Sequence, residues 1–339
     1  MIAYKKVLCC MGLLALVIGG SNGLAAAQKE KFLKIGTASQ GGLWYLTGAR
    51  LAAEIEKAFP GIKVSSTTGS ALQNPVRVNS GEVQLGLTYT PQASSFYYGI
   101  DPYSKGKPHP NLRLLSVNNL CGYTFVVSKN TDIYTFKDLQ KARISPAPKT
   151  YSVHVTTKWI LEHYGITFES IEKAGGMVTG LGYSDATGMI QDRRLDGLAN
   201  VPAGPMPHIM RLAENPGIRI LPIKEEMRDK ILADPRFKGW IKMEIPAGAY
   251  KGIDKPVPVV GLLEVFVVNK DVSDELAYTI TKLIYESKPL GDIYKTASER
   301  GFPRAFDISL ASKGMVIPVH PGAAKYYKGK GISIPPMVK

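Results

Sequence analysis

Four segments of the chain place glycine, hydroxyl and aromatic side chains directly after a short apolar run: residues 38–45, 67–74, 88–92 and 148–152. Glycine has no Cβ and lets a ligand approach the backbone, and a following helix N-terminus offers free N–H groups to an anion. The chemistry that these residues suit is the binding of a small anion such as a carboxylate. The candidate ligand-binding residues are Ser39, Gly41, Gly42, Trp44, Tyr45, Gly69, Ser70, Asn74, Thr88, Tyr89, Lys149, Thr150, Tyr151 and Ser152.

Each of these segments also has a purely structural interpretation. Trp44 and Tyr45 can stack on a ligand or simply pack in the core, and Ser70 at a strand-to-helix turn can be nothing more than a helix N-cap. One such turn is weak evidence, but four in equivalent positions favour a binding site.

Short strands and helices that alternate along the chain must position these turns. The first unit has strands expected at 32–37, 62–67 and 83–89, with helices at 43–59 and 71–80 between them. This pattern predicts a parallel sheet with crossover helices. The Gly-, Pro-, Tyr- and Lys-rich segment 97–110 is expected to be a surface loop.

A second alternation fills the middle of the chain, with strands expected at 112–117, 123–128, 142–145, 197–201 and 218–223 and helices at 153–164, 182–194 and 206–214. A long β-branched run at 257–268, two helices and a coil-rich tail follow. Two α/β units predict two lobes around a cleft, since open α/β sheets bind ligands beyond the C-terminal ends of their strands. We expect residues 28–115 and 256–339 to form one discontinuous lobe and residues 116–255 the other.

Glu264 stands alone in the otherwise apolar run 257–268. A buried carboxylate is costly unless it is paired. The simpler expectation is that Glu264 lies on the exposed side of an edge or crossing strand. The alternative is a contact with a cationic or amide group at the hinge or ligand.

The first 27 residues are typical of an export signal. Lys5 and Lys6 precede an apolar run that ends in small residues, and Ala25 and Ala27 fit the A-x-A cleavage rule. The run is shorter than the roughly 18–20 residues of a membrane-spanning helix. We therefore expect cleavage near Ala27 and a periplasmic protein.

The charge and cysteine content narrow the class further. Loss of the signal lowers the formal net charge from +14 to +12, with the Lys and Arg residues scattered along the chain. This distribution favours long-range attraction of anions over a nucleic-acid interface. Cys121 is the one cysteine beyond the signal, which excludes an intramolecular disulfide.

Four stretches resemble a known family. They are "IGTASQGGLWYLTGAR" at 35–50, "STTGSALQNPVRVNSGEVQLGLTY" at 66–89, residues 245–268 with their I-P-A-G-x-Y opening, and "MVIPVHPGAAKYY" at 315–327. They are similar to the TAXI family of solute receptors, which serve tripartite ATP-independent periplasmic (TRAP) transporters. The resemblance covers residues 32–332, and the last two stretches are its most specific.

The resemblance implies a type II periplasmic-binding fold and delivery of the ligand to a TRAP membrane permease. Family members bind small carboxylates such as glutamate or 2-oxo acids. It also implies ligand contacts from Gly41, Gly42, Tyr45, Gly69, Ser70, Asn74, Thr88 and Tyr89, and from the loop before the middle helix. That loop departs from the family pattern: Tyr151-Ser152-Val153 stands where a Gly-Ser-Gly-Thr stretch is common, so Lys149 or His154 would have to supply positive charge, or both lie on the solvated surface.

No motif for catalysis supports an enzyme. The G-x-S-x-G match at 19–23 lies in the expected signal, Gly106-Lys107 is followed by proline, and the five histidines lack metal-ligand spacing. We therefore predict an α/β solute-binding protein, a monomer without metal or cofactor, that captures a small organic ligand, a carboxylate or an amino acid, and performs no chemistry on it. The alternative is a secreted α/β enzyme or an orphan binding protein that partners a sensor.

Overall fold

The computed structural model describes residues 31–40 and 42–336. The expected export signal and Gly41 therefore lie outside the described residues. None of the helices in the described part of the chain combines the length and the hydropathy needed to cross a bilayer.

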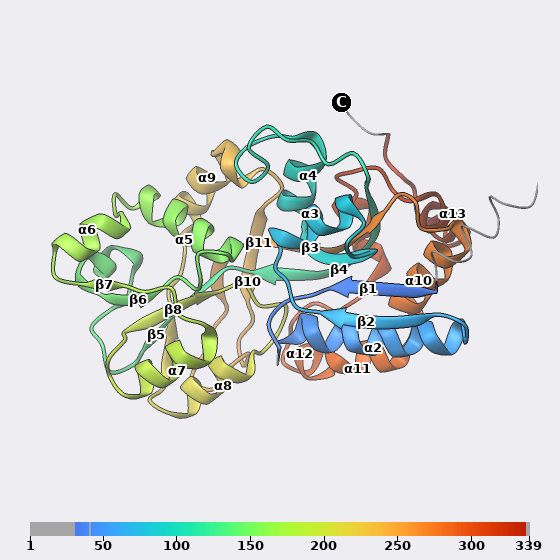
Figure 1. Ribbon diagram of the computed structural model, residues 1–339. Coiled ribbons are helices and arrows are strands. Elements are labelled where there is room, and N and C mark those ends of the chain that lie inside the picture. The colour runs from blue at the N-terminus through green and yellow to red at the C-terminus, as the bar shows by residue number, and fades with distance from the viewer. Residues whose placement is uncertain (1–30, 41, 337–339) are drawn as a thin grey trace, which may run out of the picture.

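The first sheet combines strands from residues 32–122 with strands from residues 241–269 (Figure 1). Its strand order is β10-β11-β3-β1-β2, with β4 also paired to β11. β1 runs parallel to β2 and β3, while β11 runs antiparallel to β3, β4 and β10. The strands are β1 (Phe32–Gly36), β2 (Lys63–Thr67), β3 (Leu85–Tyr89), β4 (Leu112–Gly122), β10 (Ile241–Ile245) and β11 (Val257–Asn269).

The second sheet is built from the middle of the chain and has the order β7-β6-β8-β5-β9. β6 runs parallel to β7 and β8, while β5 runs antiparallel to β8 and β9. In each sheet three parallel strands lie side by side, in the orders β2-β1-β3 and β7-β6-β8, and one antiparallel strand, β11 or β5, pairs with the last of them. The strands are β5 (Thr124–Ser128), β6 (Arg143–Ser145), β7 (Met177–Val178), β8 (Gly197–Asn200) and β9 (Ile218–Ile220).

The hydrogen-bonded ladders change from the first sheet to the second between Gly122 and Thr124, and back between Ile220 and Ile241. The lobe boundaries expected at 115/116 and 255/256 stay a prediction.

Helices cover both faces of the two sheets (Figure 1). Those of the first lobe are α2 (Leu43–Ala58), α3 (Gln73–Ser80), α4 (Thr90–Tyr98), α10 (Asp274–Glu286), α11 (Lys288–Ile293), α12 (Lys295–Glu299), the 3-10 helix at Ile308–Gly314 and α13 (Pro321–Gly329). Those of the middle segment are the 3-10 helix at Phe136–Lys141, α5 (Ser152–His163), α6 (Phe168–Lys173), α7 (Tyr183–Gln191), α8 (Pro207–Glu214), α9 (Glu225–Ala233) and the 3-10 helix at Pro235–Phe237.

Two helices, α4 and α13, were not predicted. α4 ends at Tyr98, so the loop expected at 97–110 is confirmed from residue 99 onward, whereas α13 lies in the segment predicted as a coil-rich tail. Pro91 and Pro321 lie in the first turn of their helices, where proline loses no hydrogen bond.

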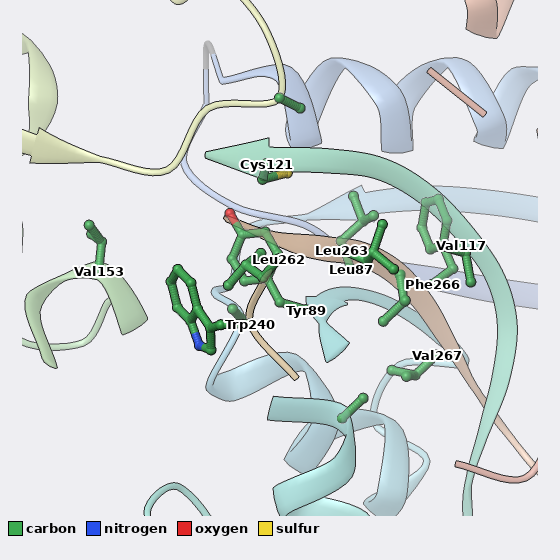
Figure 2. Close-up of a cluster of buried hydrophobic side chains, with 14 of the residues drawn as sticks. Leu87, Tyr89, Val117, Cys121, Val153, Trp240, Leu262, Leu263, Phe266 and Val267 are labelled. Carbon is green, nitrogen blue, oxygen red and sulfur yellow. The ribbon is translucent and has the colours of Figure 1, made fainter. Parts of the chain in front are cut away.

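The core of the first lobe is centred on the long strand β11, whose residues from Val259 to Asn269 are all buried. Figure 2 shows Leu262, Leu263, Phe266 and Val267 of this strand packed with side chains of β3 and β4. Cys121 of β4 belongs to this cluster as a buried free thiol. A strand apolar on both faces is expected where helices cover both faces of its sheet, so the buried Glu264 in this strand needs a specific explanation.

Candidate functional site

A cavity of about 420 Å³ lies between the two lobes and is lined by both. This volume falls in the range of small-molecule sites. The first lobe contributes Ala38, Ser39, Gln40, Gly42, Leu43, Trp44, Ser70, Ala71, Tyr89, Glu264 and Tyr294. The second contributes Tyr151, Ser152, Val153, Gly182, Tyr183, Ser184, Asp185, Asn200, Val201, Pro202, Ala203, Met206, Pro207, His208 and Arg211.

The first turns of four helices, α2, α5, α7 and α8, line this cavity. Their N-cap residues are Gly42, Tyr151, Gly182 and Met206, and at none of these positions does the N-cap side chain accept a hydrogen bond from the helix. The N–H groups of a helix's first turn have no partner within the helix, and the helix dipole favours negative charge there. The four uncapped N-termini therefore make the cavity suitable for an anion.

Aromatic rings from both lobes form the walls. Trp44 and Tyr89 of the first lobe have ring centroids 5.0 Å apart, and Tyr151 and Tyr183 of the second lie 6.1 Å apart in an edge-to-face arrangement. Tyr294 contributes a fifth ring, held by a 3.0 Å hydrogen bond between its hydroxyl and that of Thr47.

Glu264 forms part of the wall on the first-lobe side and is fully buried. Its Oε2 accepts a 2.5 Å hydrogen bond from Nε1 of Trp44, and its Oε1 accepts bonds from Nδ2 of Asn118 (3.3 Å) and Asn119 (2.8 Å). Burial raises the pKa of the carboxyl to about 7, although the three donors pull it down. The expectation of an exposed Glu264 is wrong, because β11 pairs on both sides and is covered on both faces; the alternative contact with amide groups is confirmed.

His208 and Arg211 of α8 lie on the opposite side. His208 Nε2 is 2.8 Å from Nδ2 of Asn200, and its ring stacks on Tyr183 with centroids 4.7 Å apart. Burial, with the nearby Arg211 guanidinium, lowers the pKa of His208 to about 4, so the ring is neutral near pH 7. Arg211 makes no side-chain hydrogen bond or salt bridge with the described residues, and its charge is available to a ligand.

Seven of the predicted site residues line the cavity: Ser39, Gly42, Trp44, Ser70, Tyr89, Tyr151 and Ser152. Ser70 also accepts a hydrogen bond from the N–H of Gln73, the first residue of α3, although the N-cap residue of that helix is Leu72 and not Ser70. The hydroxyls of Ser39 and Tyr151 hydrogen-bond to each other across the cleft. Beyond this pair lies a second, more open hollow of about 990 Å³, which the predicted residues Gly69 and Thr150 line.

Asn74 and Thr88 are placed inside the first lobe instead. The Asn74 amide donates to the carbonyls of Gly36, Thr37 and Leu87, and Thr88 donates to the carbonyl of Ala71. A Cβ added at Gly36 would lie 2.7 Å from Asn74 Oδ1, and one at Gly69 would lie closer still. These two glycines leave room for the Asn74 side chain.

Three further predicted residues lie elsewhere. Tyr45 is half-buried but lines neither hollow, and Lys149 is exposed outside both. His154 hydrogen-bonds through Nδ1 to the carbonyl of Ala147 and also lies outside the cavity. Ligand contact by all the predicted residues, including Gly41, stays a prediction.

The second-lobe contributors Tyr183, Asn200, His208 and Arg211 were not predicted from the sequence. Asn200 ends β8, while Tyr183 and His208 lie in the first turns of α7 and α8. Applying the rule of strand-to-helix turns to the strand predicted at 197–201 would have found Asn200 and His208. It would not have found Tyr183, which follows a strand that was not predicted, or Arg211, which lies one turn into α8.

The fold and the cavity define the class of this protein. Two mixed sheets of the same strand order, one on each side of a cavity lined by both lobes, form the type II periplasmic-binding-protein fold. The chain belongs to the NMT1-like family, whose model matches residues 35–331.

Solved structures with similarity to this chain are distant in sequence. The aliphatic sulphonate binding protein SsuA from Escherichia coli is 19% identical, with a TM-score of 0.46 over 88% of this chain and 83% of that one. The SsuA from Xanthomonas axonopodis pv. citri bound to MOPS is 16% identical, with a TM-score of 0.47 over 90% and 95%. A mutant of ArgBP from T. maritima is 12% identical, with a TM-score of 0.47 over 81% and 99%.

Proposed function

We propose that this chain is a periplasmic solute receptor that captures a small organic anion between its lobes and delivers it to a membrane permease. The observation that carries the proposal is that four uncapped helix N-termini, one from the first lobe and three from the second, line the same cavity. A ligand that contacts both lobes stabilises the closed arrangement, because only its differential affinity for the two states can drive closure.

The hydrogen bonds and ring contacts of the side chains in the cavity suit ligand binding. His208 is a neutral ring stacked on Tyr183 and hydrogen-bonded to Asn200, and Ser70 Oγ accepts a bond from a backbone N–H. A nucleophilic enzyme would instead need a hydroxyl hydrogen-bonded to a base. These contacts favour a receptor over the alternative of a secreted α/β enzyme.

The transporter class and the export route belong to the same proposal. The four stretches that resemble TAXI receptors favour a TRAP-type permease as the partner, and the residues before Gln28 favour export with cleavage near Ala27. Family membership extends over most of the chain and is compatible with this assignment.

Native mass spectrometry of the protein purified from its own periplasm tests the receptor function. We expect a small organic anion to co-purify and its re-addition to raise the melting temperature, as ligands that bind only the folded state do. Cells that lack the gene should lose uptake of that anion and regain it when the gene is restored. Steady conversion of the anion into a product by the purified protein would contradict the proposal and favour the enzyme.

A further inference from the structure

The proposed receptor function leaves the class of ligand open, and the cavity restricts it. Its charged side chains are few: Arg211 and Asp185 on the second lobe, and Glu264 on the first. With one cationic and two acidic side chains, the cavity lacks the positive charge needed to pair with a ligand that carries two negative charges. Among the described residues, Arg77 is the basic residue that lines the outer hollow, and it is occupied by Glu82 and by the carbonyl of Thr68.

Two hydroxyls that line the cavity have no hydrogen-bond partner among the described residues. They belong to Tyr89 and Ser152, of which only 9% and 7% of the residue surface is exposed. A ligand that fills the cavity would cover these hydroxyls, and polar groups covered in this way are nearly always hydrogen-bonded. Tyr89 ends β3 on the first lobe and Ser152 begins α5 on the second, so one carboxylate with its several acceptor sites can use groups from both lobes.

The remaining wall is aromatic and apolar. Trp44 lies beside Tyr89 on one lobe, and Tyr151 lies beside Tyr183 on the other. Aromatic rings prefer offset or edge-to-face contacts with other rings at centroid separations of about 4.5–7 Å. A short aliphatic dicarboxylate would leave these faces without partners, whereas a ring would contact both pairs.

Two carboxylates line this cavity and could pair with a ligand ammonium group, the buried Glu264 and the exposed Asp185. Both oxygens of Glu264 already accept hydrogen bonds, from Trp44 on one and from Asn118 and Asn119 on the other. Asp185, in the exposed first turn of α7, is then the carboxylate left for an ammonium group, and an aromatic amino acid whose ammonium group lies away from it would bury an unpaired charge, which is costly.

We propose that the ligand is an aromatic monocarboxylate, with its ring between the two aromatic pairs and its carboxylate among the free helix N-termini, Arg211 and the hydroxyls of Tyr89 and Ser152. The proposal rests on the proposed receptor function and names its ligand class.

Calorimetry on the mature protein, stripped of co-purified ligand by unfolding and refolding, tests this class. The compounds are phenylacetate and phenylpyruvate, cyclohexylacetate as the non-aromatic ring, L-phenylalanine as the zwitterion, and succinate, 2-oxoglutarate and L-glutamate. We expect the two aromatic acids to bind at least tenfold more tightly than every other compound. Tighter binding of a dicarboxylate or an amino acid would overturn the ligand class and leave the receptor function standing, whereas binding of none of them would count against both.

Two variants test the binding of the carboxylate and the binding of the ring separately. Arg211→Gln should weaken phenylacetate binding by about tenfold, while Lys158→Gln, which removes an exposed cation of α5 outside the cavity, should leave it unchanged. Tyr183→Leu should weaken the binding of phenylacetate several-fold and reduce the ratio of its affinity to that of cyclohexylacetate. Equal losses for phenylacetate and cyclohexylacetate in Tyr183→Leu would overturn the role of the aromatic walls.

Discussion

The indole N–H of Trp44 donates a 2.5 Å hydrogen bond to Oε2 of Glu264, joining residues 220 positions apart in the chain. Trp44 lies in the first turn of α2, and Glu264 lies where β11 pairs with Tyr89 of β3 and Asn119 of β4. β4 continues almost directly into β5 of the second lobe. The bond thus ties a ligand-facing helix to strands that run between the lobes, and the charge of Glu264 bears on both binding and stability.

We predict that anion binding weakens as the pH rises from 6 to 8. Glu264, with a pKa of about 7, is mostly neutral at pH 6 and mostly a carboxylate at pH 8, where it repels an anionic ligand. Tyr89, Cys121 and Tyr294, which surround it, have pKa values raised by burial and stay neutral over this range. Calorimetry with phenylacetate, which is ionised throughout, should show a fall in affinity of up to tenfold per pH unit above 7.

Glu264→Gln is the control for this pH dependence, because it removes the titration and keeps the shape of the side chain. Its affinity for phenylacetate should be nearly constant between pH 6 and 8. An equal slope in the variant and the native protein would assign the effect to another group.

Glu264 should also make the ligand-free protein less stable as the pH rises. Its pKa in the folded state, about 7, lies above the ordinary value of 4.5, so the folded state binds the proton more tightly than the unfolded state. The stabilisation is complete below about pH 4.5 and is lost as the pH rises through 7, which amounts to about 3 kcal/mol. The free energy of unfolding, measured with urea at pH 5 and pH 8, should therefore fall by about this amount in the native protein and stay nearly constant in Glu264→Gln. The amide group of the variant is a poorer partner for the Trp44 N–H, but this cost is the same at both pH values.

Asn74 should matter for stability more than for direct ligand contact. Its amide donates to three carbonyls of β1, β3 and the turn after β1, so Asn74→Ala leaves buried acceptors without a partner. We expect a loss of about 3 kcal/mol in the free energy of unfolding, measured with urea. Asn130→Ala, at an exposed turn, should cost little. Unchanged stability with lost ligand affinity would restore the sequence-based interpretation of Asn74 as a binding residue.

The alternation of strands and helices predicted the two α/β units because hydrophobic periodicity records which faces each element buries. The turn at Ser39–Trp44 and the start of α5 were found because ligand sites of such sheets lie beyond strand ends. The environment of Glu264 was not predictable in this way. Whether β11 is an edge or a central strand depends on pairing with β3, β4 and β10, which lie up to about 180 positions away in the chain.

For Asn74 the sequence alone does not separate a ligand contact from a structural role. Its turn looks like an anion-binding loop, since glycine and hydroxyl residues at a strand-to-helix turn suit both a ligand and a local hydrogen-bond network. In the structure Gly36, Gly69 and Gly86 surround the Asn74 side chain, which favours the structural role, and ligand contact by Asn74 stays a prediction.

The hydrogen bond between Ser39 and Tyr151 spans the two lobes and separates the enclosed cavity from the open outer hollow. Tyr151→Phe removes this bond and keeps the ring. The closed state loses one neutral hydrogen bond, worth about 1 kcal/mol, so ligand dissociation should become about fivefold faster while association changes little. Stopped-flow fluorescence with phenylacetate measures both rates, and Tyr134→Phe, which alters an exposed tyrosine away from the cavity, is the matched control. A slower association with unchanged dissociation would mean that Tyr151 guides entry of the ligand instead of holding the lobes closed.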